Sequence, residues 1–171
     1  KCSDVHALHP HPTHPLTTQS IPLYTNLQNK SEVDNSMVPS LFICHGAPSL
    51  ALEDNDYTRY LQQLGQQITP KPEAIVIFTA HWESEFPTIS YTNDVYETIY
   101  DFGGFAPELY QIKYPAKGST SVAEKVEEMF KAQGIPSKRD TKRGLDHGSW
   151  VVLRMLYPDP DIPVVQISVN P

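Results

Sequence analysis

Continuous apolar runs alternate with amphipathic stretches along most of the chain. The segments 40–44 (SLFIC), 74–80 (AIVIFTA) and 162–169 (IPVVQISV) are apolar runs with β-branched residues, which is typical of strands covered on both faces. Between the first two runs, apolar side chains recur at helical spacing at Tyr57, Tyr60, Leu61, Leu64 and Ile68. This pattern predicts a β-α-β unit in the first half of the chain.

Two further helices are expected in the second half. Ser121 and Glu124 have the spacing of a capping box, and Gly134 supplies a stop signal. The face of this helix carries Val122, Val126, Met129 and Phe130. Another helix is expected after His147, through Trp150, Leu153 and Leu156. Strands alternating with helices predict an α/β fold in which helices cover the sheet.

The two ends of the chain differ from its middle. Residues 1–36 are rich in polar residues and proline without periodicity, so we expect a disordered leader or a non-native extension there, followed by one catalytic domain over 37–171. The leader's HPHPTHP run could bind metals loosely, although a Pro-rich spacer is the simpler interpretation of His9, His11 and His14. Because Pro171 directly follows a predicted inner strand, we expect the domain to be C-terminally truncated.

Composition narrows the class of protein. A chain of 171 residues, 39% apolar and 19% charged, is enough for one globular domain. A net charge of -7 without a basic cluster argues against a nucleic-acid partner. Every apolar run is far shorter than the roughly 20 residues that cross a bilayer, so no membrane association is expected. Cys2 and Cys44 form neither a disulfide framework nor a paired zinc site, which favours a reducing, cytoplasmic setting.

Three histidines outside the leader occur in similar surroundings. His45 and His81 each follow a predicted buried strand by one residue, and ligands of open α/β sheets bind beyond the carboxyl ends of strands. His147 precedes its helix in a turn bracketed by Gly144 and Gly148, which permit close backbone approach. Each histidine alone could be structural, but neutral imidazole is a common metal ligand. We therefore expect a divalent metal held by at least His45 and His81.

Four blocks carry a resemblance to a known family. Residues 45–57 (HGAPSLALEDNDY), 79–84 (TAHWES), 100–118 (YDFGGFAPELYQIKYPAKG) and 144–168, which opens GLDHGSW, are similar to successive signatures of the class III extradiol ring-cleavage dioxygenases, in the 4,5-DOPA dioxygenase-like branch. The resemblance implies a three-layer α/β/α sandwich around a mixed, mostly parallel sheet. It also implies one Fe(II) or Zn(II) centre per subunit and a catecholic substrate such as DOPA, cleaved with O2. Members of this family extend beyond the end of this chain.

The resemblance also implies roles for the histidines. His45 and His81 correspond to metal ligands of the family, and His147 corresponds to a residue at the metal centre that acts as ligand or as acid-base group. Oxygen insertion beside a catechol needs a redox-active metal with open positions, whereas zinc has no redox chemistry. An imidazole with a pKa near neutrality can both accept and donate the protons that ring cleavage moves.

Other residues have two interpretations each. Asp146 either orients His147 or simply caps the following helix. Glu83, two residues after His81, could complete a set of two histidines and one carboxylate. The DFGGF block is either a substrate-side loop or simply a turn with hydrophobic anchors, and Tyr110 either hydrogen-bonds a catechol or covers the sheet edge. The family resemblance favours the functional interpretation, which assigns substrate binding to Phe102, Gly103, Gly104 and Tyr110.

Two alternatives from other functional classes are left open by the residues. One is a zinc hydrolase on the same sheet, in which His45 and His81 bind the ion that activates water. The other is an inactive, truncated remnant, which would bind metal weakly and expose a strand edge.

Overall fold

The structure, a computed structural model, describes residues 39–171. Within this range the chain forms a four-stranded sheet, three α-helices and two short 3-10 helices. None of these helices is both long and apolar enough to cross a lipid bilayer. The predicted leader over 1–36, with the metal binding considered for its histidines, and Cys2 lie outside the described residues.

The sheet is mixed, with strand order β1-β4-β2-β3. Strand β1 (Ile75–Glu83) pairs in parallel with β4 (Val164–Val169), which pairs antiparallel with β2 (Thr88–Ser90); β2 in turn pairs in parallel with β3 (Lys138–Asp140). Two of the three pairings are thus parallel, which confirms the mixed, mostly parallel sheet. The inner position of β4, with its first five residues buried, explains its unbroken apolar pattern.

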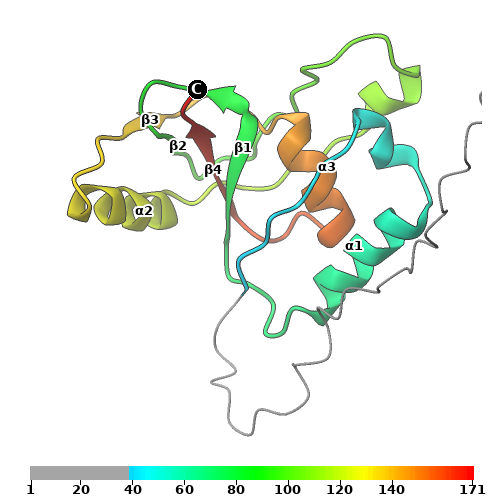
Figure 1. The fold of residues 1–171 in the computed structure, drawn as a ribbon, viewed down its shortest axis with the longest axis horizontal. Coiled ribbons are helices and arrows are strands. Elements are labelled where there is room, and N and C mark those ends of the chain that lie inside the picture. The colour runs from blue at the N-terminus through cyan, green and yellow to red at the C-terminus, as the bar shows by residue number, and fades with distance from the viewer. Residues whose placement is uncertain (1–38) are drawn as a thin grey trace, which may run out of the picture. The chain divides into compact units, whose positions relative to one another are not determined.

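Helices cover both faces of the sheet. The side chains of β4 alternate between the two faces, so successive residues of the strand pack against different helices. Val164 packs with the buried side chains of α3 (His147–Leu156) on one face. Val165 and Ile167 pack with α2 (Thr120–Ala132) on the other face. Figure 1 shows α2 and α3 on opposite sides of β4. This arrangement confirms the three-layer α/β/α sandwich.

Helix α1 (Asp56–Gln67) packs against α3 and lies farther from the sheet (Figure 1). Its N-terminus is capped by Asn55, whose side chain accepts from the Thr58 N–H. Leu61 is 1% exposed and forms a cluster with the outer face of α3. The two helices approach so closely that a Cβ on Gly65 would lie 1.9 Å from the Leu156 carbonyl oxygen. The predicted helix between the first two apolar runs is confirmed.

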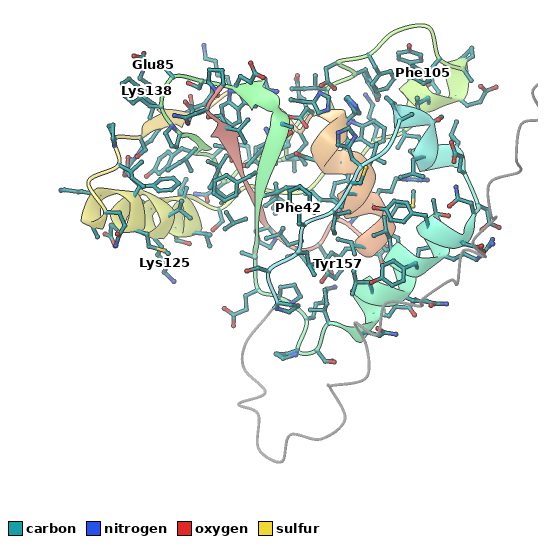
Figure 2. The ribbon with its side chains drawn as sticks, viewed as in Figure 1. Phe42, Glu85, Phe105, Lys125, Lys138 and Tyr157 are labelled. Carbon is teal, nitrogen blue, oxygen red and sulfur yellow. The ribbon has the colours of Figure 1, made fainter. Side chains whose placement is uncertain are left out.

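The strand predicted over 40–44 is wrong. These residues have no helix or strand structure, and a 3-10 helix, η1 (Pro48–Leu52), follows them. Leu41 is 42% exposed and Phe42, labelled in Figure 2, is fully exposed. An apolar run becomes a strand only when its backbone finds a pairing partner, and among the described strands β1 pairs with β4 alone. The expected β-α-β unit therefore lacks its first strand.

The predicted start of the second-half helix is also wrong, by a small margin. The N-cap of α2 is Ser119, whose side chain accepts from the N–H three residues later, and not Ser121. Glu124 does not close a capping box, since its carboxylate accepts from the Tyr91 hydroxyl at 2.6 Å. The predicted apolar face packs toward the sheet through Val122, Val126 and Phe130. Met129 was expected on that face but is 68% exposed.

Candidate metal centre

His147 is the first residue of α3, and the pairing of two loops sets its position. The Leu145 N–H donates to the Glu97 carbonyl at 2.9 Å, and the Ile99 N–H donates to the Leu145 carbonyl at 2.8 Å. Asp146 follows with extended backbone and caps the helix, because its side chain accepts from the N–H three residues later at 3.1 Å. The His147 side chain is only 7% exposed. The His147 imidazole therefore lies at the N-terminus of α3 in a nearly buried position.

His81 lies inside β1 and not one residue beyond it, because the strand continues to Glu83 through a register shift after Thr79. Its N–H donates to the Thr79 hydroxyl at 3.2 Å. The ring packs on the first turn of α3, where a Cβ on Gly148 would lie 2.6 Å from the His81 Cδ2. Glycine at this position is thus a condition for the observed position of the His81 ring.

His45 directly follows the segment 40–44, which was expected to be a strand. Gly46 has a φ of 63°, a left-handed conformation that turns the chain directly after the histidine. The Tyr57 hydroxyl of α1 donates to the Cys44 carbonyl at 2.5 Å. A turn and one hydrogen bond to α1, in place of strand pairing, hold His45 at the site.

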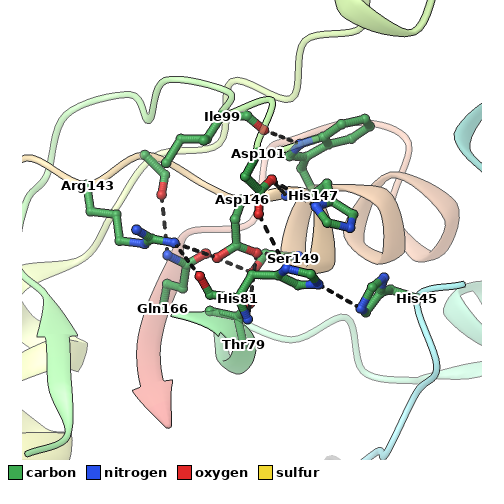
Figure 3. Close-up of polar contacts among 12 residues, drawn as sticks. His45, Thr79, His81, Ile99, Asp101, Arg143, Asp146, His147, Ser149 and Gln166 are labelled. Atoms are coloured by element: carbon green, nitrogen blue, oxygen red, sulfur yellow. Dashed lines mark hydrogen bonds and ion pairs between the residues drawn. The ribbon is translucent and has the colours of Figure 1, made fainter. Parts of the chain in front are cut away.

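The three imidazoles converge although they come from three separate elements (Figure 3). The Nε2 atoms of His45 and His81 lie 3.0 Å apart, and one ligand nitrogen from each of the three rings lies within 4.8 Å of the others. Nitrogens bound to one ion at about 2.1 Å each are separated by about 3.0 to 3.5 Å. The separation of the first pair falls in this range, so these residues could hold a metal ion. Among residues 39–171, Glu83 is not part of this cluster.

Asp101 is the carboxylate that contacts the imidazoles, and our sequence analysis missed it. Its Oδ1 accepts from the His147 N–H at 3.0 Å and lies 2.8 Å from the His147 Nδ1. Its Oδ2 lies 3.4 Å from the His81 Nδ1. The sequence did contain a clue, because Asp101 is the first residue of the DFGGF block and directly precedes Phe102. We considered only the aromatic and glycine residues of that block.

Asp146, which we predicted either to orient His147 or to cap α3, is engaged with other groups. Its carboxylate is completely buried and accepts from the Thr79 hydroxyl at 2.8 Å, in addition to its capping bond. Arg143 donates to its other oxygen at 3.2 Å and to the His81 carbonyl at 3.0 Å (Figure 3). The cap is therefore observed, and Asp146 ties α3 to β1 beneath the histidines. A direct part in catalysis stays a prediction.

The charge state of two groups is shifted by these surroundings. Burial, followed by the proximity of His81 and His147, lowers the pKa of His45. Burial would raise the pKa of Asp101, but hydrogen bonds from the His147 N–H and imidazole outweigh it, and the net pKa lies below its usual value. Both shifts favour neutral imidazole at His45 and ionised carboxylate at Asp101, the forms that suit a cation site.

Aromatic side chains line one side of the histidine cluster. The Phe102 ring lies edge to face with the His147 ring, with centroids 5.5 Å apart. Tyr110, from the 3-10 helix η2 (Pro107–Gln111), lies 5.2 Å from Phe102. Trp150 of α3 is fully buried behind them, and its indole N–H donates to the Ile99 carbonyl at 3.0 Å. Of the predicted substrate-binding residues, Phe102 thus lies beside His147, and Tyr110 packs against Phe102.

The two glycines of the same block form an open turn. A Cβ on Gly103 or Gly104 would meet no atom within 4 Å, and Gly104 has a φ of 78°. The turn lets the Phe105 ring return to 5.4 Å from the Phe102 ring. Substrate binding by these residues and by Tyr110 stays a prediction.

Comparison with known proteins identifies the family. The family model described as the catalytic LigB subunit of aromatic ring-opening dioxygenase matches residues 37–171. The chain belongs to this family. The resemblance carried by the HGAP, TAHW, DFGGF and LDHG blocks is therefore confirmed.

Relatives within the LigB family are similar in sequence. The chain is 41% identical over 140 residues to the 4,5-DOPA dioxygenase extradiol of Beta vulgaris, covering 80% of this chain and 52% of that protein. It is 43% identical over 139 residues to the 4,5-DOPA dioxygenase extradiol of Escherichia coli K12, covering 81% of this chain and 50% of that protein. The chain thus spans about half the length of these relatives.

A solved structure supports the fold. The crystal structure of an uncharacterized protein from Escherichia coli K12 is similar with a TM-score of 0.53 and 40% sequence identity. The similarity covers 69% of this chain and 42% of that chain. The α/β sandwich is therefore shared with a related protein.

Proposed function

We propose that residues 37–171 form part of the catalytic domain of an extradiol dioxygenase, which opens the ring of a catecholic substrate such as DOPA with incorporation of O2. The observation that carries this proposal is the convergence of His45, His81 and His147 beside an aromatic wall, formed by Phe102 and the Tyr110 ring packed against it. The similarity to the two 4,5-DOPA dioxygenases supports the substrate class. The free, exposed thiol of Cys44 suits a reducing compartment, and we place the enzyme in the cytoplasm.

We assign metal binding to His45 and His81, with His147 at the same centre as ligand or as acid-base group. Bound Fe(II) would supply the one-electron chemistry that lets O2 react with a catecholate, which Zn(II) cannot supply. The His147 Nδ1 is occupied by Asp101, so its Nε2 is the atom that faces the site. As an acid-base group, this Nε2 would accept a catechol proton and return it later in the reaction.

The aromatic wall would position the ring of the substrate. Phe102 lies beside His147 and Tyr110 packs against Phe102, so an aromatic ligand at the histidines could pack on the Phe102 ring edge to face or with an offset stack. Such packing excludes water and fixes the orientation of the ring relative to the histidines. We therefore assign substrate binding to the 102–110 segment, including Gly103 and Gly104.

The proposal is tested by oxygen uptake of protein reconstituted anaerobically with Fe(II). DOPA, catechol and protocatechuate would be supplied in turn, and the yellow ring-opened product followed by absorbance. We expect uptake that tracks product formation and is lost in His81→Ala. The matched control is Lys125→Ala on α2 (Figure 2), the helix that packs on the sheet face opposite to α3, and it should behave as the wild type. Because the chain spans about half the length of the two relatives, the same assay is run on a version extended to the stop codon of the gene. No uptake from either form with verified iron content would refute the proposal, and anaerobic ester hydrolysis by the zinc form would then favour the hydrolase alternative.

The role of His147 is resolved by comparing two variants. If His147 is a ligand, His147→Ala and His45→Ala should lower Fe(II) affinity by similar factors. If His147 transfers protons, His147→Ala should keep iron bound and lose ring opening, with a changed pH profile for the residual rate. Iron content and rate, measured on the same samples, separate the two roles.

A further inference from the structure

One carboxylate contacts two of the three histidines. Asp101 presents Oδ1 to the His147 Nδ1 at 2.8 Å and Oδ2 to the His81 Nδ1 at 3.4 Å. The same Oδ1 also accepts from the His147 backbone N–H, so the carboxylate is fixed relative to the start of α3. Figure 3 shows Asp101 with its contacts to the His147 side of the cluster.

The chemistry of a carboxylate restricts the partner atoms. An ionised carboxylate only accepts hydrogen bonds, so a ring nitrogen that faces it must carry the proton. The His147 Nδ1, at 2.8 Å from the carboxylate, is therefore the protonated atom of its neutral ring. The longer 3.4 Å approach of the other carboxylate oxygen favours the same tautomer at His81 electrostatically. The Nε2 atoms of both rings keep the lone pairs, and the His81 Nε2 is the atom that lies 3.0 Å from the His45 Nε2. One residue thus favours the ligand-ready tautomer of two rings.

No other carboxylate among residues 39–171 is shown in this position. Asp146 is buried nearby, but its oxygens are taken by Thr79, the capping N–H and Arg143. The third histidine is held differently, since the Nδ1 of His45 is buried without a hydrogen-bond partner in the described part of the chain. The sharing of Asp101 is therefore specific to His81 and His147.

The position of Asp101 also links the histidines to the aromatic wall. It lies next to Phe102, whose ring contacts His147 at 5.5 Å between centroids. The pairing of Ile99 with Leu145 holds this segment against the start of α3. The backbone that places the carboxylate therefore also places the aromatic ring.

We propose that Asp101 is a positioning residue, which fixes the tautomer and orientation of His81 and His147 so that both Nε2 atoms face the metal. The proposal rests on the proposed metal centre but not on the identity of the substrate. Partners of metal-bound histidines typically contribute 10- to 100-fold to metal affinity. Asp101→Asn keeps the shape of the side chain but offers one acceptor oxygen and one N–H donor group. One of the two rings must then face a donor and change its tautomer or turn away.

The test uses histidine-selective ¹⁵N NMR of the metal-free chain, because the nitrogen shifts report which ring nitrogen carries the proton. We expect His81 and His147 to be Nδ1-protonated in the wild type, and at least one of them to change in Asp101→Asn. Zn(II) affinity, measured by chelator competition, should fall about 10- to 100-fold in the variant. The matched control is Asp94→Asn, an exposed aspartate shortly after β2 that has no contact with the three described histidines, which should change neither readout.

An Nε2-protonated His81 or His147 in the wild type would overturn the proposal. So would an Asp101→Asn variant that folds, keeps both tautomers and binds Zn(II) within twofold of the wild type. If the variant does not fold, the wild-type spectrum decides by itself. Neither readout needs iron, O2 or a catechol, so failure of the positioning role is distinguishable from failure of the dioxygenase function, which appears only as absent oxygen uptake.

Discussion

Replacing Gly148 by alanine tests whether the His81 ring must lie on the first turn of α3. A Cβ at this position would lie 2.6 Å from the His81 Cδ2, and 3.3 Å from the Thr79 hydroxyl and from an Asp146 carboxylate oxygen. Carbon atoms in ordinary contact are about 3.5 to 4.0 Å apart. The His81 ring must therefore move by about 1 Å, because the other two neighbours are hydrogen-bonded to each other.

The variant should separate metal affinity from stability. A displacement of about 1 Å moves the His81 Nε2 away from the shared centre, and we expect Zn(II) or Fe(II) affinity to fall about 10- to 100-fold, the loss typical when the support of a ligand is removed. The helix itself favours alanine over glycine by up to about 1 kcal/mol, which offsets part of the strain. We therefore expect the free energy of unfolding to change by no more than about 1 kcal/mol.

The assay is chelator-competition titration together with urea unfolding of the metal-free protein. Gly65→Ala is the matched control, because its Cβ would meet the Leu156 carbonyl oxygen at 1.9 Å, far from the histidines. It should lower stability by about 1 to 3 kcal/mol, as overpacking does, and leave the metal affinity of the folded protein unchanged. Wild-type metal affinity in Gly148→Ala would refute the inferred dependence of the site on this close approach.

Three further predictions concern the stability of the scaffold. Trp150→Ala should cost about 3 to 5 kcal/mol in urea unfolding, because it empties a fully buried position and leaves the Ile99 carbonyl without its donor; a cost below 1 kcal/mol would contradict the packing. Asn55→Ala should cost about 1 kcal/mol by removing the cap bond to the Thr58 N–H, and an unchanged thermal midpoint would show that the cap contributes nothing. Burial raises the pKa of the Tyr96 hydroxyl, so the unfolded chain releases the hydroxyl proton at a lower pH than the folded chain, and the free energy of unfolding should fall as the pH rises above about 10. In Tyr96→Phe the free energy of unfolding should fall less steeply over this pH range, and identical pH profiles would exclude this contribution.

Patterns within single segments were sufficient for part of the structure. The alternation of apolar runs with apolar residues at helical spacing correctly predicted β1, β4, α1 and α3, because a helix or strand that buries one face has apolar residues at regular intervals. The same reasoning failed at 40–44, where an equally apolar run has no strand partner in the described structure. It also misplaced Met129, since only the position of α2 over β2 and β4 determines which part of its stripe is covered.

The sequence by itself therefore determined the sandwich of helices and strands, the LigB family and the choice of His45, His81 and His147 as the residues to examine. Their motifs are local, and their chemistry does not depend on what lies opposite them. Only the tertiary structure decided that the three rings converge, that Gly148 makes room for His81, and that Asp101 rather than Asp146 contacts His147. The last of these contacts joins Asp101 and His147, which are 46 positions apart and which the pairing of the 97–99 segment with Leu145 brings within 3 Å. A hydrogen bond between residues so far apart in the sequence produces no periodic pattern, because it arises from the packing of whole elements.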